Sequence, residues 1–394
     1  MNSIKLGKKI IDCNSLYFIA DIGANHNGSL EKAIELIHLA KESGADAAKF
    51  QNFQADKIVS KTGFDNMKNK LSHQSNWKKS VYEVYQDASI SKNWTKTLKD
   101  ECDKVGIDYF TSPYDFESVD LVDPYVDFYK IGSGDISWLD IVDYILDKNK
   151  PVLIATGAST SHDVSRVMNM AMKKTNDLVL MQCNTNYTGS DENFKYCNLN
   201  VLKQFSIDYP NTMLGLSDHT KGHSTTLGAI ALGARVIEKH FTDNNNQDGP
   251  DHAFAMNPKS WRDMVDRSYE LLVALGNGIK VVEANEEQSK VVQRRCLRVV
   301  RSLKTGHKLT NDDLVALRPI SPGGFEPYEK GSIIGKTLIK DISSGEHLTK
   351  QFIDFRGSYI ESFNKKYFDQ FHDLNFVQDD FSTSTRNTLR GLHG

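Results

Sequence analysis

The chain has few cysteines for its length. Five occur in 394 residues, their number is odd, their spacing is wide, and no Cys-x-x-Cys pair is present. This usage argues against a disulfide framework and against a zinc site built from cysteines. Cys183 closes an apolar run, where we expect a small buried thiol rather than a reactive one.

A long hydrophobic run and an excess of charge of one sign are also missing. No apolar run approaches the roughly 20 residues of a membrane span, and the lysines of Met1–Asn14 precede no apolar stretch of signal-peptide length. The formal net charge is only −3, so no basic field points to nucleic acid or to an anionic membrane. We therefore expect a cytoplasmic protein that binds neither.

What is present suffices for a large folded core. Hydrophobic residues make up 39% and charged residues 25% of the chain, as in ordinary globular proteins. Because 394 residues exceed the usual size of one compact domain, we expect two or three structural units.

The first 280 residues alternate between short apolar runs and helix-like segments. Such runs are typical of parallel strands that are buried on both faces, and polar residues gather at nearly every carboxyl end. This layout predicts a (β/α)8 TIM barrel with its site at those ends. A doubly wound open sheet shares the local pattern, but its ligands favour one switch point. The eight predicted strands are residues 17–21, 45–50, 107–111, 126–131, 151–156, 178–183, 213–216 and 236–237.

Residues 52–90 are polar and too long for an ordinary connection. We interpret them as an irregular segment that is either a lid or active-site insertion or plain surface decoration.

The character changes after residue 280. Residues 281–293 predict a linker helix, and short strands at 297–303, 315–319 and 333–338 predict a small β-rich domain, so that 281–354 form a second unit. Arg318 precedes a Pro-Gly-Gly turn, either as an ordinary surface residue or as a ligand-binding one. Residues 355–394 predict β segments whose partners are missing.

Two histidines stand at the ends of neighbouring predicted strands. His219 follows Leu-Ser-Asp and His240 follows Ile-Glu-Lys, so both imidazoles are expected on one face of the barrel. Two imidazoles beside carboxylates favour a shared divalent metal. The alternative is that each histidine only bonds a loop carbonyl.

Charged groups at other strand ends indicate an anionic substrate. Lys49 and Lys130, with nearby serines and threonines, suit phosphate and carboxylate groups, although a structural ion pair is the alternative for each lysine. Asp21 and Asp135 suit proton transfer or hydroxyl binding. A phosphate-bearing acid together with a metal-bound carbonyl compound predicts carbon–carbon bond formation, which residue types alone do not distinguish from an aldolase.

Seven motifs carry a resemblance to a known family over residues 1 to about 354. They are IGANHNG (22–28), KFQ (49–51), YKIGSG (129–134), ATG (155–157), GLSDHT (215–220), EKHFT (238–242) and GPD (249–251). With these motifs the chain resembles the sialic acid synthases, which condense phosphoenolpyruvate with an N-acylated hexosamine such as N-acetylmannosamine, plus water, into a nine-carbon acid and phosphate. The resemblance implies a TIM barrel, a small antifreeze-like (SAF) domain and a domain-swapped homodimer.

The same resemblance implies roles for individual residues. His219 and His240 hold a divalent metal, Mn²⁺ or Mg²⁺, that acts in catalysis. Arg318 reaches the sugar's N-acyl group in the barrel of the partner subunit. The residues implied to hold phosphoenolpyruvate are Lys49, Lys130, Ser133 and Ser217, and those implied to face the sugar are Gln51, Asp135, Tyr187 and Asp251.

One position departs from the family pattern. The family usually has glutamate where this chain has Asp21, the residue expected to handle the proton of the incoming water. Aspartate keeps the carboxylate but is one methylene shorter, and proton transfer needs hydrogen-bond reach. Lower activity, or a water that bridges the gap, is therefore expected.

The tail resembles a second family. Residues 356–361 and 375–393 look like the opening of a dTDP-4-dehydrorhamnose 3,5-epimerase cupin, in which residues matching Arg390 and His393 lie in the active site. Only a part of such a barrel is present, which leaves strand edges unpaired. A truncated, inactive fragment of a fused synthase-epimerase is the hypothesis for residues 355–394.

Three functions remain in competition. The leading one is a synthase of N-acetylneuraminate, legionaminate or a relative. Pseudaminate is less expected, because Gly23 is often serine in those synthases. The others are a metal-dependent aldolase-type enzyme on the same fold, and a sugar-binding protein that lost catalysis at Asp21.

Overall fold

The computed structural model describes residues 3–67, 74 and 77–355. The chain divides into two compact units, Met1–Gly278 and a second that begins at Ile279. Within the described residues, every helix is too short or too polar to cross a lipid bilayer. The predicted β segments of the tail lie beyond residue 355 and therefore outside the described part of the chain.

The first unit is built on eight parallel strands. Their order in the sheet is β5-β4-β3-β10-β9-β8-β7-β6, and β5 and β6, at the two ends of this order, pack against each other. The sheet therefore curves into a near-closed barrel, which confirms the predicted TIM barrel. The strands are β3 (Tyr17–Asp21), β4 (Ala47–Asn52), β5 (Asp108–Pro113), β6 (Tyr129–Ile131), β7 (Val152–Ala155), β8 (Leu178–Cys183), β9 (Met213–Asp218) and β10 (Val236–His240).

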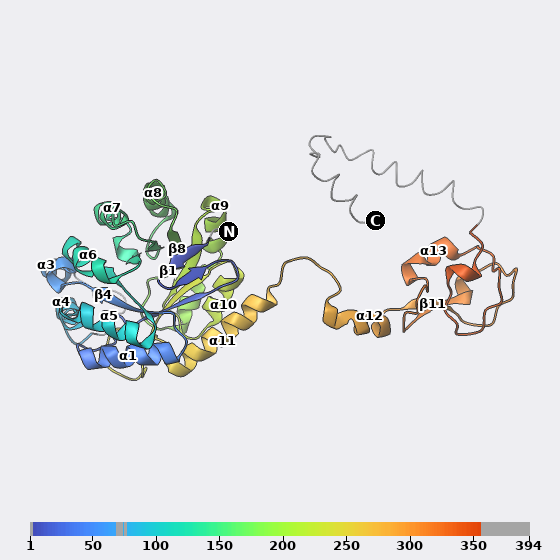
Figure 1. Cartoon of the computed structure of the whole chain (residues 1–394), viewed down its shortest axis with the longest axis horizontal. Helices are drawn as coiled ribbons and strands as arrows, with labels where there is room; N and C mark the ends of the chain where they lie inside the picture. Colours follow the sequence, from blue (N-terminus) through green and yellow to red (C-terminus); the bar gives the residue numbers. More distant parts are fainter. Residues whose placement is uncertain (1–2, 68–73, 75–76, 356–394) are drawn as a thin grey trace. The chain divides into compact units, whose positions relative to one another are not determined.

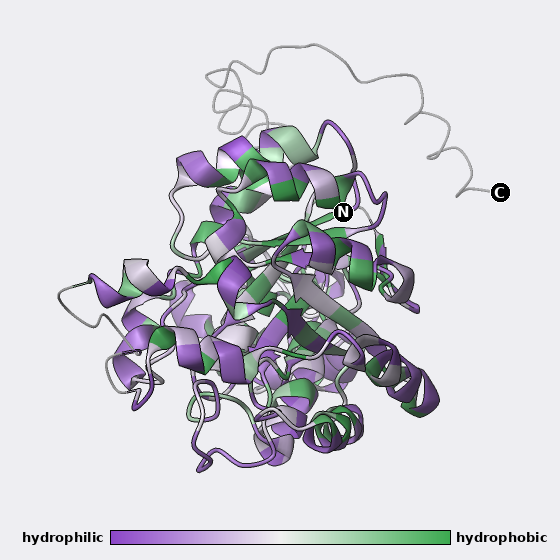
Figure 2. Ribbon diagram, turned by 90° about the vertical axis from the view of Figure 1, so that its left-hand side faces the viewer, coloured by the Kyte–Doolittle hydropathy of each residue, from purple (hydrophilic) through white to green (hydrophobic). Residues whose placement is uncertain are grey.

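A helix follows each strand and covers its outer face (Figure 1). Local signals fix where these helices begin and end: Ser29 caps the first from its side chain, and Gly106, with a φ of 76°, ends the second in the left-handed region. Hydrophilic and hydrophobic residues alternate along the helices (Figure 2), as one buried face requires. They are α1 (Leu30–Glu42), α5 (Trp94–Val105), α6 (Phe116–Val122), α7 (Leu139–Leu146), α8 (Ser161–Ala171), α9 (Val201–Asp208), α10 (Ser224–Ala231) and α11 (Pro258–Ala274).

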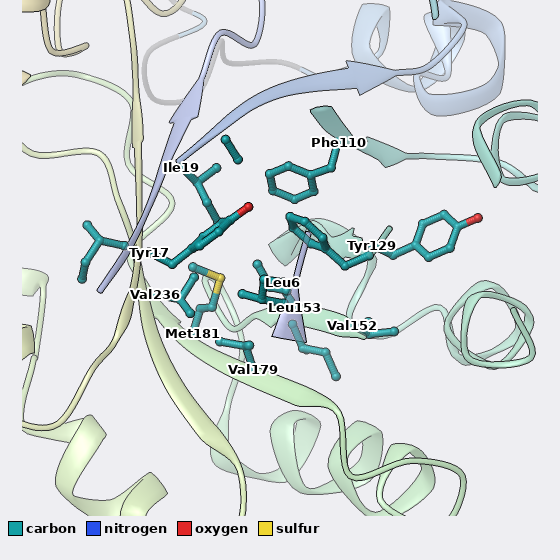
Figure 3. Packing of buried hydrophobic residues seen from close by; sticks show 14 of the residues in the cluster. Leu6, Tyr17, Ile19, Phe110, Tyr129, Val152, Leu153, Val179, Met181 and Val236 are labelled. Carbon is teal, nitrogen blue, oxygen red and sulfur yellow. The ribbon is translucent and has the colours of Figure 1, made fainter. Parts of the chain in front are cut away.

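A hairpin before the barrel was not predicted from the sequence. Strands β1 (Ile4–Leu6) and β2 (Lys9–Ile11) pair antiparallel, and Leu6 is fully buried in the same cluster as Tyr17, Leu153 and Met181 (Figure 3). Three-residue strands are too short for a periodic pattern. Their position is decided by the apolar interior that they cover.

The insertion after β4 is more regular than predicted. It contains the short helices α2 (Ala55–Ile58), α3 (Lys61–Asp65) and α4 (Val81–Ala88). A reciprocal capping box between Ser80 and Glu83 opens α4. The prediction of an irregular segment was wrong for these stretches, because helices of four, five and eight residues give too little periodicity to be recognised from the sequence.

The second unit has its own small core. Helix α12 (Glu287–Gln293) precedes an antiparallel pair, β11 (Cys296–Val299) and β12 (Leu314–Leu317), and isolated bridges complete the β-rich structure. The strand predicted at 333–338 was wrong. Helix α13 (Lys330–Ile333) occupies its start, and Gly335, with a φ of 81°, interrupts the extended backbone.

Candidate active site

A pocket of about 490 Å³ opens at the carboxyl ends of the barrel strands. All the sequence-predicted site residues of the barrel line it, whereas Arg318 lies exposed in the second unit. The predicted residues that the fold brings together are Asp21, Lys49, Gln51, Lys130, Ser133, Asp135, Tyr187, Ser217, His219, His240 and Asp251.

One side of the pocket contains a buried ion pair between side chains of two neighbouring strands. Lys49 Nζ on β4 lies 2.5 Å from Asp21 Oδ2 at the end of β3, and Gln51 Nε2 donates to the same oxygen at 3.3 Å. Burial acts to raise the pKa of Asp21, but the Lys49 ammonium and His240 outweigh it and lower that pKa to about 2. Asp21 is therefore an ionised carboxylate at neutral pH.

A second buried pair involves a residue that sequence reasoning missed. Glu238 Oε1 accepts from Lys130 Nζ at 2.8 Å and from Ser217 Oγ at 3.1 Å, and lies 3.8 Å from Lys49 Nζ. Strand alternation could have identified it, because Glu238 stands two residues before His240 and so shares its face of β10. Both predicted phosphate-binding lysines are thus ion-paired, but the pairs line the pocket and are not remote from it.

Next to these pairs, the backbone at Gly157 lies close to the side chains of Ser133 and Thr185. The Ser133 hydroxyl accepts from the Gly157 amide at 3.0 Å. A Cβ at Gly157 would lie 2.8 Å from Ser133 Oγ and 2.4 Å from the Thr185 side chain. A side chain at this point of the Ala-Thr-Gly motif would therefore have to displace the side chains of Ser133 and Thr185.

The two predicted metal-binding histidines are neighbours. Their ring centroids are 5.4 Å apart, and both rings are buried. His219 Nδ1 lies 2.8 Å from the Asn184 carbonyl oxygen, which can only accept, so Nδ1 carries the proton. Burial, with His240 beside it, lowers the pKa of His219 to about 3. His219 is thus a neutral ring whose Nε2 keeps a lone pair.

This donor set suits a divalent ion held by two imidazoles. An Nδ1–H bond to a carbonyl is the usual way in which proteins orient a metal-binding histidine. Asp21 Oδ1 and Glu238 Oε2 are buried without a hydrogen-bond partner in the described part of the chain. Among those residues, no three His, Cys, Asp or Glu side chains converge on one point, so a metal here would draw its other ligands from substrate or water.

The outer part of the pocket suits a polyhydroxylated ligand. Burial raises the pKa of Asp135 to about 6. Asp251 Oδ2 lies 3.3 Å from the Ala24 amide and 3.6 Å from His240 Nδ1. The centroid of the Tyr187 ring lies 4.3 Å from the centroid of the His219 ring. Carboxyl groups beside aromatic faces are typical of sites that bind sugar hydroxyls and ring edges.

The insertion after β4 forms an apolar wall of this pocket. Its lining residues are Phe53, Ile58, Gln74, Trp77, Val84, Tyr85 and Ala88. The Phe53 ring packs against Tyr85 in a tilted arrangement and against Tyr114 edge to face, at 5.5 and 5.8 Å between ring centroids. Of the two interpretations of residues 52–90, the geometry supports a segment that contributes to the site over mere surface decoration.

Family models match nearly all of the chain. The NeuB family model matches residues 36–280, the SAF domain model residues 294–354, and the dTDP-4-dehydrorhamnose 3,5-epimerase model residues 336–394. The last two matches share residues 336–354.

Similar proteins include several synthases. N,N'-diacetyllegionaminic acid synthase of Legionella pneumophila is 32% identical, over 90% of this chain and 98% of that protein. Pseudaminic acid synthase of Campylobacter jejuni is 30% identical, over 84% and 95%. The structure of N-acetylneuraminic acid synthetase from Leptospira borgpetersenii covers 73% of this chain and 95% of its own, with 26% identity and a TM-score of 0.64. The chain therefore belongs to the NeuB family, the family of the sialic acid synthases.

Proposed function

We propose that this chain condenses phosphoenolpyruvate with an N-acylated hexosamine, plus water, to give a nine-carbon 2-keto acid sugar and phosphate. The observation that carries the proposal is the presence of two buried lysines and two adjacent buried imidazoles in one pocket. The lysines suit an anionic substrate, and the imidazoles suit a metal that activates a carbonyl substrate.

Phosphoenolpyruvate would bind at the deep end. Lys49, Lys130, Ser133 and Ser217 offer ammonium and hydroxyl donors that suit phosphate and carboxylate oxygens. Burial acts to lower the pKa of Lys130, but Glu238 beside it outweighs burial and raises that pKa, so Lys130 stays charged at any physiological pH. Held there, the enol carbon of the substrate faces the outer half of the pocket, where the sugar aldehyde would lie.

The sugar would bind in the outer half, against Gln51, Asp135, Tyr187 and Asp251. His219 and His240 would hold Mn²⁺ or Mg²⁺. When bound, such an ion supplies Lewis-acid polarisation of a carbonyl group. In the reaction a bond forms between the enol carbon and the aldehyde carbon, while the π electron pair of the aldehyde moves to its oxygen, which takes up a proton. Water then adds to the resulting cationic carbon, and the carbon–oxygen bond to phosphate breaks.

Asp21 is the candidate acceptor for the proton of that water. Its Oδ2 is bound by Lys49 and Gln51, and Oδ1 is buried with no hydrogen-bond partner in the described chain. One oxygen therefore positions the carboxylate and the other is available to the water. The side chain is shorter than the glutamate usual in the family, yet it reaches the pocket lining.

The test is phosphate release from phosphoenolpyruvate with manganese present, against N-acetylmannosamine and its 6-deoxy-diacetamido relatives. We expect release with at least one sugar, and loss of release on chelation. Mass spectrometry of the product identifies the nine-carbon acid and therefore the sugar.

Two other results would contradict the proposal. Release with aldoses that lack an N-acyl group, at equal efficiency, would indicate an aldolase-type condensation. Binding of manganese and phosphoenolpyruvate with no release for any sugar would indicate a sugar-binding protein without catalysis.

A further inference from the structure

The Glu238 carboxylate accepts hydrogen bonds from the same side chains that are proposed to bind phosphoenolpyruvate. Its Oε1 takes hydrogen bonds from Lys130 at 2.8 Å and from Ser217 at 3.1 Å, and lies 3.8 Å from Lys49 Nζ. The side chain is buried, with 3% of the residue exposed. A substrate anion that binds Lys130, Ser217 and Lys49 therefore has to share these three donors with the Glu238 carboxylate.

The charges of the inner pocket already cancel. Two ammonium groups, Lys49 and Lys130, are matched by two carboxylates, Asp21 and Glu238. A phosphate that arrives at Lys130 therefore meets an anion at hydrogen-bond distance from the same nitrogen. Like charges this close, in a site shielded from water, repel strongly. The arrangement favours orientation of the donors over tight retention of phosphate.

We propose that Glu238 is a positioning residue that holds Lys130 and Ser217 in place and limits the affinity of the pocket for phosphate-bearing anions, so that product phosphate is released. This inference rests on the proposed function, because it takes these donors as the phosphoenolpyruvate site. Loss of an ordinary binding residue weakens the affinity for the ligand, whereas loss of the Glu238 charge should strengthen the affinity for phosphate-bearing anions.

The sign of the effect makes the inference testable. Glu238→Gln keeps the side-chain size and the Oε1 acceptor but removes the charge. Calorimetric titration of the full chain with inorganic phosphate and with phosphoenolpyruvate, in chelator so that metal occupancy plays no part, should show at least tenfold tighter binding of both. Phosphate should also inhibit turnover of this variant more strongly. Glu238→Ala, a second variant without the charge, should change both affinities in the same direction.

The matched control is Asp251→Asn. Asp251 also lines the pocket, but it contacts the Ala24 amide and His240, and no lysine among the described residues pairs with it. We expect its phosphate affinity to stay within about twofold of the wild type. If Asp251→Asn bound phosphate as tightly as the Glu238 variants, the inference would be overturned, because the loss of any negative charge in the pocket would then be enough to raise the phosphate affinity.

Unchanged or weaker phosphate binding in both Glu238 variants would also overturn it, because Glu238 would then be a plain structural or binding residue. A failure of the proposed function itself would give a different result from a failure of this inference. In that case the wild-type chain binds no phosphoenolpyruvate, or releases no phosphate from it with any sugar, whatever stands at position 238.

Discussion

At the scale of single residues, Asp135 shows how burial alone shifts the pKa of a carboxyl group in the pocket. Burial raises its pKa to about 6, above the value of about 4 in an unfolded chain. The folded protein therefore binds more protons between these values, and its stability falls as pH rises from about 4 to about 6.

Asp135→Asn should remove this cost. One pKa unit is worth about 1.4 kcal/mol, and solvent access to the pocket reduces the full shift to about 1–2 kcal/mol. We expect the variant to exceed the wild type by that amount in free energy of unfolding at pH 8 and to match it below pH 4. Urea denaturation at both pH values measures the difference. A gap that is equal at both pH values would mean that the carboxyl group does not titrate as inferred.

Single residues also show the limit of sequence reasoning. Asp21, Lys49, Lys130, His219 and His240 were recognised because each stands at the end of an apolar run, and the barrel brings such ends together. Glu238 was missed although it lies in a motif that was noticed. Its partners Lys130 and Ser217 come from other strands, so only the folded sheet shows that three strands meet at one carboxylate.

At the scale of elements, β9 and β10 are joined by a buried ion pair outside the pocket. Lys239 Nζ bonds Asp218 Oδ2 and also donates to the Thr220 carbonyl at 2.7 Å, and both charged side chains are buried. Because Asp218 precedes His219 and Lys239 precedes His240, this pair fixes the register of the two strands that carry the imidazoles.

Lys239→Met should leave Asp218 buried without its counter-ion. Loss of one partner of a buried pair costs about 3–5 kcal/mol, although the Thr220 and Thr225 hydroxyls that bond Asp218 should hold the loss near the lower figure. Guanidinium denaturation measures it. Lys203→Met, on the exposed side of α9, is the control and should change stability by less than about 0.5 kcal/mol.

Helix α4 provides a separate prediction about substrate specificity. Tyr85 on this helix lines the outer pocket, whereas Gln86 is exposed. Loss of an aromatic contact costs about 1–1.5 kcal/mol, so Tyr85→Ala should raise the KM for the sugar roughly tenfold. The affinity for phosphoenolpyruvate, bound on the other side of the pocket, should stay constant.

Steady-state kinetics with each substrate varied in turn, together with phosphoenolpyruvate titration, separates the two effects. Gln86→Ala should leave both constants unchanged. If Tyr85→Ala weakened phosphoenolpyruvate binding as strongly as sugar binding, the insertion would support the whole pocket and not the sugar side alone.

At the scale of the whole molecule, Arg318 belongs to the second unit, while every other predicted site residue belongs to the first. We propose a domain-swapped homodimer in which Arg318 of one subunit reaches the sugar in the barrel of the other. Arg318→Ala should then raise the KM for N-acylated sugars, because the guanidinium no longer bonds the acyl oxygen.

Mixing two impaired variants, assayed at a sugar concentration far below the raised KM of Arg318→Ala, tests whether Arg318 acts across subunits. Lys130→Ala removes the phosphoenolpyruvate site but keeps Arg318, and Arg318→Ala keeps the barrel site. If the subunits exchange, mixed dimers should be more active at that concentration than either variant alone. Sedimentation equilibrium establishes the dimer independently. A dimer without recovery on mixing would place Arg318 at the pocket of its own chain, and a monomer would remove the proposal.

The sequence by itself determined the barrel, its strand order along the chain and the residues at the strand ends. Apolar runs, helix caps and helical spacing of apolar residues are local properties, so they can be read without the fold. Only tertiary structure decided the ion pairs, the paired imidazoles, the β1–β2 hairpin and the helical wall of the pocket. Each of these depends on which distant segments become neighbours, and on how burial changes the charge of the groups placed there.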